Sequence, residues 1–237
     1  MSDIKNAKIF HKINQIVDTK MTDWVQRWQD GKIGWHRDVV NSRLVEFIDC
    51  LKLQAGDSVF VPLCGKSQDM VYLLEQGFKV VGVEISQLAI EQFFEENQLR
   101  YSLKEVNSFS VYQAKNITLY CGDYFALKAS DLKPISGAYD RASLIALPID
   151  LRENYARHLY SIIPSGCRVL LLTLNYPQSQ MSGPPYALSE SEVVSLFSKG
   201  FECQQLQCFN DIKNEPKFQR SDVDFIEKAT YCLQKEK

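Results

Sequence analysis

The stretch from Ser58 to Glu84 constrains the fold of this chain more than any other part of it. Its two apolar runs, Val59–Val61 and Val80–Val83, show no alternation of apolar and polar residues, which is typical of parallel strands buried on both faces. Between these runs, apolar residues recur at helical spacing over positions 70–74. The stretch therefore predicts a strand, a turn, a helix and a second strand that ends on an acidic residue.

Glu84 follows the turn at Leu63 and Cys64 by 21 residues. A carboxylate at the end of the second strand of a Rossmann-like unit accepts hydrogen bonds from the two hydroxyls of a ribose. A strand that ends in glutamate also occurs without any ligand, so the acid alone leaves both interpretations open. The ligand that it predicts is a nucleoside with an unphosphorylated ribose.

The turn itself argues against the common phosphate-binding loops. A dinucleotide site needs the pattern G-x-G-x-x-G, whereas residues 62–66 contain one glycine and a proline that has no N–H. A P-loop needs a glycine five positions before Gly65, where this chain has Phe60, a side chain that would block the phosphate cradle. NAD, FAD and ATP are therefore disfavoured. A nucleoside ligand without a phosphate to cradle points to S-adenosylmethionine.

Composition bounds the remaining possibilities. The 237 residues are 45% hydrophobic, enough for a full α/β core, and no linker or repeat divides them. Lysine and arginine number 27 against 29 acidic residues, with no long basic run, so we expect no nucleic-acid partner. No apolar stretch has the length of a leader peptide or a membrane span, which predicts a cytoplasmic protein.

The seven cysteines are odd in number and form no C-x-x-C pair. Most of them lie inside apolar, strand-like runs. We therefore expect reduced thiols in the core and no metal site.

Strands and helices continue to alternate along the rest of the chain. Helices are predicted after Ser86, from Asp150 and after Ser189, because these residue types cap helix N-termini. Five further strands are predicted at 117–121, 137–144, 169–174, 201–209 and 225–233, the last two as an antiparallel pair. The predicted fold is α/β and Rossmann-like, with a seven-stranded, mostly parallel sheet and helices on both faces.

Six motifs occur in order along the chain: Trp24-x-x-x-Trp28-x-x-Gly31-Lys32-Ile33-Gly34-Trp35-His36, Val61-Pro62-Leu63-Cys64-Gly65-Lys66-Ser67, Val81-Gly82-Val83-Glu84-Ile85-Ser86, Tyr120-Cys121-Gly122-Asp123-Tyr124-Phe125, Tyr139-Asp140-Arg141-Ala142 and Gly183-Pro184-Pro185-Tyr186. On these motifs the chain resembles the thiopurine S-methyltransferase family, including its bacterial members, over nearly its whole length. The P-L-C-G-K-S turn is the most specific, because ordinary methyltransferases have a glycine-rich turn there. The resemblance implies a class I methyltransferase that moves a methyl group to the sulfur of a small aromatic or heterocyclic thiol such as a thiopurine.

All three tryptophans fall between residues 24 and 35, a concentration that core packing explains poorly. The resemblance implies a single domain over 1–237, in which a helical N-terminal lid region, 1–50, covers a core at 55–237. It assigns Trp24 and Trp28 to the cofactor, where indole faces can attract a sulfonium. The alternative is an amphipathic helix that docks these two residues into the core.

The resemblance also implies the remaining contacts. Leu63, Gly65 and Glu84 would hold the cofactor, and Asp123 and Tyr124 would meet its adenine, although Gly122-Asp123 also suits an ordinary turn.

The acceptor side would consist of an aromatic residue, a histidine and a rigid loop, namely Trp35, His36, Pro184, Pro185 and Tyr186. His36 has the chemistry of an acid or base, but a structural role is the alternative.

Arg141 is the candidate catalytic residue and a further cofactor contact. Its guanidinium comes at the end of a predicted strand, where it is costly to bury without a partner. It either pairs with Asp140 or faces the donor's carboxylate, the acceptor or a water, and the resemblance favours a ligand.

The reaction makes light demands on the protein, because the donor is activated and the acceptor sulfur is polarisable. No metal or strong general base is required. Alternatives are methylation of selenium or tellurium species, a non-catalytic S-adenosylmethionine-binding protein, and a nucleic-acid or protein methyltransferase. The resemblance favours a monomer.

Overall fold

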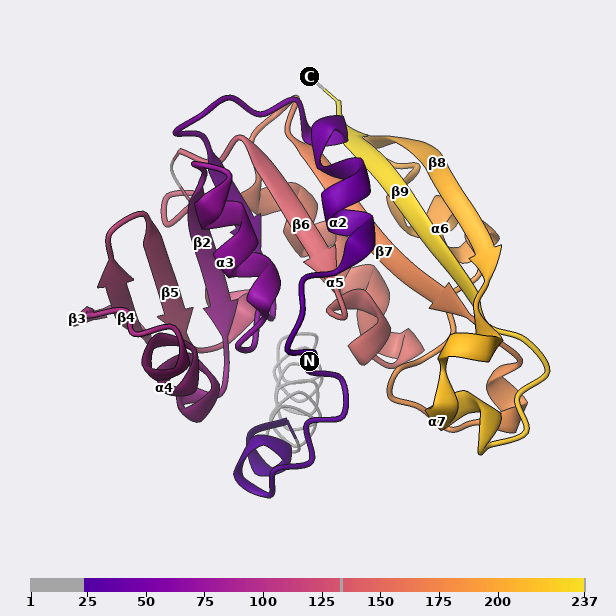
Figure 1. Cartoon of the computed structure of the whole chain (residues 1–237). Coiled ribbons are helices and arrows are strands. Elements are labelled where there is room, and N and C mark those ends of the chain that lie inside the picture. The colour runs from indigo at the N-terminus through magenta and orange to yellow at the C-terminus, as the bar shows by residue number, and fades with distance from the viewer. Residues whose placement is uncertain (1–23, 133, 237) are drawn as a thin grey trace, which may run out of the picture.

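Nine strands form one sheet in the computed structural model, which describes residues 24–132 and 134–236. Their order across the sheet is β3-β4-β5-β2-β1-β6-β7-β9-β8 (Figure 1). In chain order the strands are β1 (Ser58–Val61), β2 (Lys79–Glu84), β3 (Ser102–Val106), β4 (Phe109–Ala114), β5 (Ile117–Cys121), β6 (Gly137–Arg141), β7 (Arg168–Asn175), β8 (Phe201–Asn210) and β9 (Glu227–Lys235).

The centre of the sheet is parallel and its two sides are antiparallel. Strands β5, β2, β1, β6 and β7 pair in parallel, whereas the β3-β4-β5 and β7-β9-β8 pairings are antiparallel. All four residues of β1 are buried, as expected for a central strand without alternation. The prediction of a Rossmann-like α/β fold is confirmed, as is the antiparallel pair at the C-terminal end.

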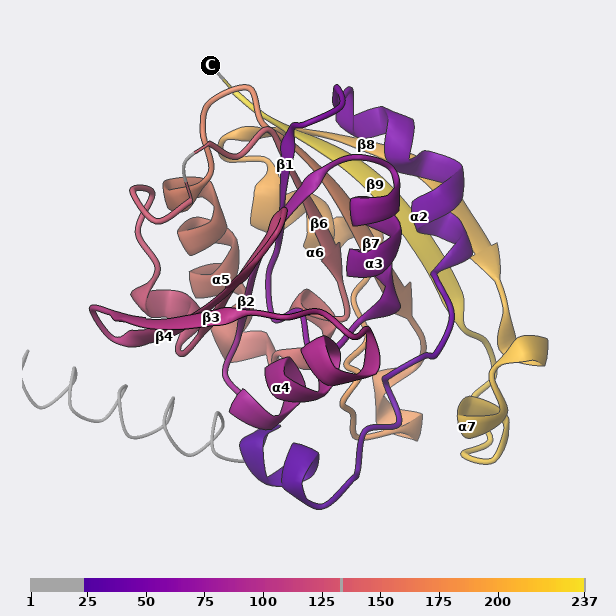
Figure 2. The ribbon, with the colours of Figure 1, turned by 60° about the vertical axis from the view of Figure 1, so that its left-hand side comes forward.

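Helices cover both faces of the sheet (Figures 1 and 2). One face carries α2 (Ser42–Phe47), α3 (Gln68–Glu75) and α4 (Gln87–Glu96), whose buried residues share one hydrophobic cluster with β1 and β2. The other face carries α5 (Ile149–Ile162) and α6 (Glu190–Phe197), which belong to a second cluster. A third, smaller cluster lies around α7 (Pro216–Gln219).

Short helical segments complete the described chain. Residues 24–29 are helical, and 3₁₀ helices occur at η1 (Ile48–Leu51), η2 (Tyr124–Ala126), η3 (Leu144–Ala146), η4 (Gln178–Gln180) and η5 (Ile212–Asn214). Across 24–132 and 134–236, the structure contains no helix of the length and apolar character needed to cross a membrane.

The expected strand number, seven, was wrong because the hairpin β3–β4 went unrecognised. All five residues of β3 are exposed, so this edge strand lacks the apolar side that would mark it in the sequence. The available signal was the two-residue connection Asn107-Ser108, in which Asn107 has φ +54°, a conformation that asparagine tolerates in tight hairpin turns.

Helix caps followed the sequence closely. Ser86 and Ser189 cap α4 and α6, accepting hydrogen bonds from the backbone N–H of Ala89 and of Glu192. The spacing of Asp150 to Glu153 predicted a helix start at Asp150, and this was wrong. Helix α5 begins at Ile149, and its N-cap is Pro148.

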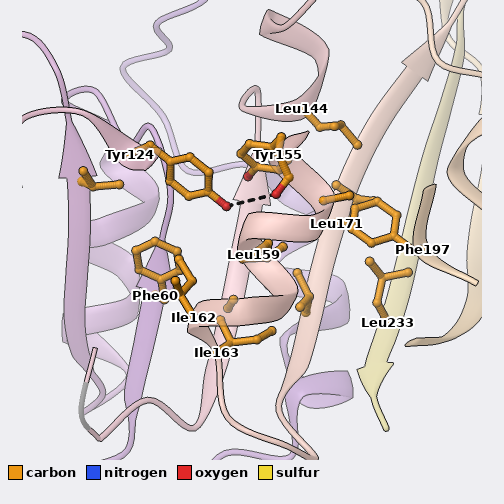
Figure 3. Close-up of a cluster of buried hydrophobic side chains, with 14 of the residues drawn as sticks. Phe60, Tyr124, Leu144, Tyr155, Leu159, Ile162, Ile163, Leu171, Phe197 and Leu233 are labelled. Atoms are coloured by element: carbon orange, nitrogen blue, oxygen red, sulfur yellow. Dashed lines mark hydrogen bonds between the residues drawn. The ribbon is translucent and has the colours of Figure 1, made fainter. Parts of the chain in front are cut away.

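Tyr124 and Tyr155 connect the second cluster to the carboxyl edge of the sheet. Their rings stack with centroids 4.8 Å apart, and the Tyr124 hydroxyl donates to the Tyr155 carbonyl O at 3.4 Å (Figure 3). The Tyr155 hydroxyl donates to Asp140 Oδ2 at 2.6 Å. The end of β6 and the segment after β5 are thereby fixed to α5.

Candidate active site

A cavity of about 860 Å³ opens at the carboxyl ends of the parallel strands. This is the edge at which open α/β sheets bind ligands. The N-terminal segment, residues 24–41, and α7 lie at this same edge, below the arrowheads in Figure 1. The cavity is lined by twelve of the thirteen residues predicted for the site: Trp24, Trp28, Trp35, His36, Leu63, Gly65, Glu84, Asp123, Tyr124, Arg141, Pro184 and Pro185.

Glu84 is held by the backbone around it. Its Oε2 accepts from the Gly65 N–H at 2.9 Å and its Oε1 from the Ser86 N–H at 2.8 Å. Burial raises the pKa of Glu84, and the backbone N–H groups of Ser86, Gly65 and Ile85 counter this in part. A carboxylate offers about four acceptor positions, so these two bonds leave room for the two hydroxyls of a ribose.

The turn after β1 lies directly under the N-terminal segment. Leu63 has φ +43° and Gly65 has φ +52°, so the chain reverses tightly here, in a conformation that non-glycine residues rarely adopt. A Cβ on Gly65 would lie 3.2 Å from Cζ2 of Trp28. Glycine at this position therefore allows the indole to pack onto the turn.

The three tryptophans form one cluster at the cavity. The Trp35 ring meets Trp24 and Trp28 edge to face, with centroids 4.9 and 5.8 Å apart. Trp28 is buried, and both Trp24 and Trp28 line the cavity. The part of the lid region before residue 24 lies outside the described residues.

His36 lies next to this cluster with its ring largely covered. Its Nε2 is 3.1 Å from Asp38 Oδ1. Burial lowers the pKa of His36, and the charge of Lys66 lowers it further. The nearby Asp38 opposes this shift in part. The net shift favours the neutral imidazole, which could accept a proton.

Asp123 and Tyr124 occupy the segment after β5. The Asp123 side chain accepts from the Phe125 N–H at 2.8 Å and so caps η2. Tyr124 turns its ring onto Tyr155, as described above, so its backbone is the part available to an adenine. The turn interpretation and the ligand interpretation of this motif are thus compatible.

Arg141 pairs with a residue that the sequence did not indicate. Its Nε donates to Asp69 Oδ2 at 2.6 Å and its Nη2 to Ser67 Oγ at 2.9 Å. The alternative of a pair with Asp140 was wrong, because that buried carboxylate accepts from Tyr155 on the other face of the sheet. The only local sign that Asp69 belongs to the site was its position in the first turn of α3, the helix that follows the turn after β1.

The loop after β7 forms one wall. Pro184 and Pro185 line the cavity and both follow cis peptide bonds. Lys217 of α7 donates from Nζ to the Pro184 carbonyl O at 3.1 Å, which joins two walls. Tyr186 is not part of the lining: its N–H donates to the Ile145 carbonyl O at 2.7 Å, and its ring packs on Gly183.

The cavity is rich in cationic residues, although the chain has a net charge of −2. Eight lysines and arginines line it against four carboxylates: Arg27, Lys32, Arg37, Arg43, Lys66, Arg141, Lys217 and Lys228 against Asp69, Glu84, Asp123 and Glu215. Sequence reasoning missed Arg43 and Lys228, because they come from α2 and β9, outside every motif. Arg43 donates to the Ala229 carbonyl O at 2.9 Å, and burial lowers its pKa.

Ion pairs connect the segments around the cavity. Arg37 Nη2 of the N-terminal segment lies 3.4 Å from Glu215 Oε2, and Lys228 Nζ lies 2.7 Å from Oε1 of the same carboxylate. In the described ranges, no group of three or more His, Cys, Asp or Glu side chains is arranged to hold a metal. Every described cysteine is a free thiol.

Known proteins match this chain closely. The family model for thiopurine S-methyltransferase (TPMT) matches residues 19–236. Proteins named thiopurine S-methyltransferase from Shewanella sp. (strain ANA-3) and Pseudomonas aeruginosa (strain LESB58) are 42% and 40% identical to it over 212 residues, which are 90% of this chain and 97% of each relative.

Solved structures share the fold at low sequence identity. A Burkholderia thailandensis 1,6-didemethyltoxoflavin-N1-methyltransferase with bound S-adenosylhomocysteine superposes with a TM-score of 0.63 at 16% identity, covering 96% of this chain and 90% of that one. An Anabaena variabilis SAM-dependent methyltransferase gives the same score at 17% identity, over 91% and 95%. The chain therefore belongs to the thiopurine S-methyltransferase family and is a methyltransferase that uses S-adenosylmethionine.

Proposed function

We propose that the protein methylates the sulfur of a small aromatic or heterocyclic thiol, such as a thiopurine. The observation that carries this proposal is one cavity that combines three indoles, the Glu84 turn and several lysines and arginines. Three of the lysines, at positions 32, 66 and 228, are paired with carboxylates outside the lining. Such a cavity favours an anionic, planar acceptor, and a heterocyclic thiol supplies a thiolate near neutral pH. The names of the two relatives described above point to the same acceptor class.

The described residues fit an adenosyl donor. Glu84 has acceptor positions left for a ribose, while Leu63 and Gly65 form the turn beneath it. Trp24 and Trp28 would cover the donor, and Asp123 with the backbone of Tyr124 would meet its adenine. When bound, the donor supplies a methyl group activated by its sulfonium.

The acceptor would lie between the tryptophan cluster and the proline wall. Trp35, Pro184 and Pro185 offer flat apolar surfaces to a ring, and Lys217 brings a positive charge to the same wall. Arg141, whose Nε and Nη2 are engaged by Asp69 and Ser67, turns its remaining donors toward the ligands. The lowered pKa of His36 favours its neutral form, which would take a proton from a thiol that arrives protonated. Tyr186 would support this wall from behind.

Positioning would supply most of the rate acceleration. The cationic lining stabilises the thiolate, and the covering segments keep water out of the cavity. A mechanism based on positioning and thiolate stabilisation needs neither a metal nor a strong base.

We propose a single methyltransferase domain over 1–237, with 1–50 as the lid region and 55–237 as the core. Residues 1–23 of the lid region lie outside the described residues. A cytoplasmic enzyme without a nucleic-acid partner agrees with the balanced charge and apolar pattern of the sequence. We propose a monomer on the family resemblance alone.

An acceptor screen with product mass detection tests the proposal. The panel pairs each thiol with its oxygen analogue, for example a thiopurine with the matching hydroxypurine, and adds selenide and tellurite. We expect a mass gain of one methyl group on the thiols and none on the oxygen analogues. Methylation of the selenium or tellurium species alone would overturn the thiol assignment in favour of that alternative.

A further inference from the structure

Asp69 is a fully buried carboxylate at the back of the active-site cavity. It lies in the first turn of α3, and none of its surface is exposed to solvent. A buried carboxylate must be compensated by donors or cations, and its partners reveal which groups it holds in place.

Three donors from different parts of the chain converge on this carboxylate. The backbone N–H of Asn41 donates to Oδ1 at 2.8 Å. Arg141 Nε and the Tyr139 hydroxyl donate to Oδ2 at 2.6 and 3.0 Å. One side chain therefore joins the end of the N-terminal segment to the strand β6 that presents Arg141.

The two ends of this connection are both parts of the site. Asn41 closes the N-terminal segment that carries the three tryptophans, and it caps α2 by accepting from the Arg43 N–H at 3.0 Å. At the other end of the connection, one edge of the Arg141 guanidinium is fixed, because its Nε donates to Asp69 and its Nη2 donates to Ser67. Because a guanidinium is planar, fixing this edge also fixes the direction of its remaining donors.

We infer that Asp69 is a positioning residue that couples the docking of the N-terminal segment to the orientation of Arg141. The inference deepens the proposed function, since it uses the same cavity. It differs from a purely structural ion pair, which would stabilise the fold without affecting how Arg141 meets a ligand.

A double-mutant cycle tests the coupling. The affinity for S-adenosylhomocysteine and the KM for the acceptor are measured for Asp69→Asn, Arg141→Ala and the double variant. Arg141→Ala should change one of these two parameters, either the affinity for S-adenosylhomocysteine or the acceptor KM. We expect Asp69→Asn to change the same parameter in the same direction, by about tenfold. The double variant should lie within about twofold of Arg141→Ala alone. An amide oxygen at position 69 can still accept from the Asn41 N–H, so the substitution mainly removes the charge that holds Arg141. Effects that simply multiply would overturn the inference.

Asp140→Asn is the matched control. It also removes the charge of a buried carboxylate, at the residue next to Arg141, but its partner is Tyr155. We expect this control to lower the melting temperature while changing both ligand parameters much less than Asp69→Asn does. If the control changed the ligand parameters as much as Asp69→Asn does, the effect of Asp69 would be one of general stability, and the inference would be wrong.

The other end of the connection is tested at Asn41, which also covers the case in which Asp69→Asn does not fold. Its φ of −69° suits proline, so Asn41→Pro removes the N–H that Asp69 accepts, whereas Asn41→Ala removes only the side-chain cap. We expect trypsin to cleave at Arg37 faster in Asn41→Pro than in Asn41→Ala. Asn41→Pro should also show the larger change in the ligand parameter that Arg141→Ala alters. Equal behaviour of the two variants would contradict the coupling. Cleavage and donor affinity require no thiol methylation, so they remain decisive if the proposed acceptor class is wrong.

Discussion

The Gly65 N–H donates to Glu84 Oε2 at 2.9 Å and thereby joins the turn after β1 to the end of β2. The same carboxylate accepts from Ser86 at the start of α4. Two strands and a helix thus meet at one acidic side chain, and the position of any ligand bound by Glu84 is set by the backbone of all three.

Glu84→Gln should weaken binding of S-adenosylhomocysteine ten- to a hundredfold. A neutral amide loses charge-assisted hydrogen bonds to a ribose, a cost of about 1.5–3 kcal/mol. The variant should also melt at a lower temperature, because the amide cannot accept from both backbone N–H groups. Calorimetry measures the affinity, with Glu105→Gln on the exposed strand β3 as the control for loss of an acid. Unchanged affinity would remove Glu84 from the ribose site.

Intrinsic tryptophan fluorescence should change when the donor or its demethylated product binds. All three tryptophans of the sequence line the cavity, so a ligand there alters the surroundings of each indole. Limited proteolysis of the N-terminal segment should slow in the complex, because the ligand adds contacts beneath it. Equal emission and equal cleavage rates with and without ligand would contradict the covering role of residues 24–41.

Arg37→Ala should speed product release while leaving stability nearly unchanged. The Arg37–Glu215 pair is exposed on the arginine side, and exposed ion pairs contribute about 0–1 kcal/mol. It nevertheless joins the N-terminal segment to the segment before α7, so its loss should raise the rate of dissociation. Stopped-flow fluorescence measures this rate, and Arg157→Ala, which breaks the surface pair with Glu153 on α5, is the control. Similar dissociation rates in both variants would argue against a connection between the two segments.

The alkylation rate of Cys232 should level off at a lower pH than that of Cys167, although both thiols are buried. A hydrogen bond from the Cys50 thiol and the nearby Arg168 guanidinium lower the pKa of Cys232 to about 7, whereas burial raises that of Cys167 to about 12. The reactive thiolate forms as pH rises, so the modification rate of Cys232 should rise through pH 7 and then level off. Peptide mass spectrometry follows each site. A midpoint that neither Cys50→Ala nor Arg168→Gln moves would refute the proposed causes.

The sequence predicted the parts of the site that lie within one motif. Glu84 and Gly65 belong to a single strand–turn–helix–strand unit, so local spacing sufficed to place them. The unusual turn excluded phosphate-binding loops, and the cluster of tryptophans indicated the covering segment. The hairpin β3–β4 escaped because a fully exposed edge strand carries no apolar alternation.

The partners of Arg141 could not be read from the sequence. Asp69 is 72 residues away and Asp140 is adjacent, yet the arginine pairs with the distant acid. Neighbouring residues of a strand point to opposite faces, so Asp140 turns toward α5 while Arg141 turns toward α3. The cationic residues of the lining were also hard to predict, because they come from α2, α7 and β9, which lie far apart in the sequence and meet only in the folded chain.

Methyl transfer to sulfur is tested most directly by a single-turnover reaction with a thiopurine acceptor and S-adenosylmethionine labelled with ¹³C in its methyl group. We expect one S-¹³CH₃ resonance, formed together with an equal amount of S-adenosylhomocysteine. Label on a ring nitrogen, or no transfer to the thiopurine or any other thiol despite donor binding, would contradict transfer to sulfur.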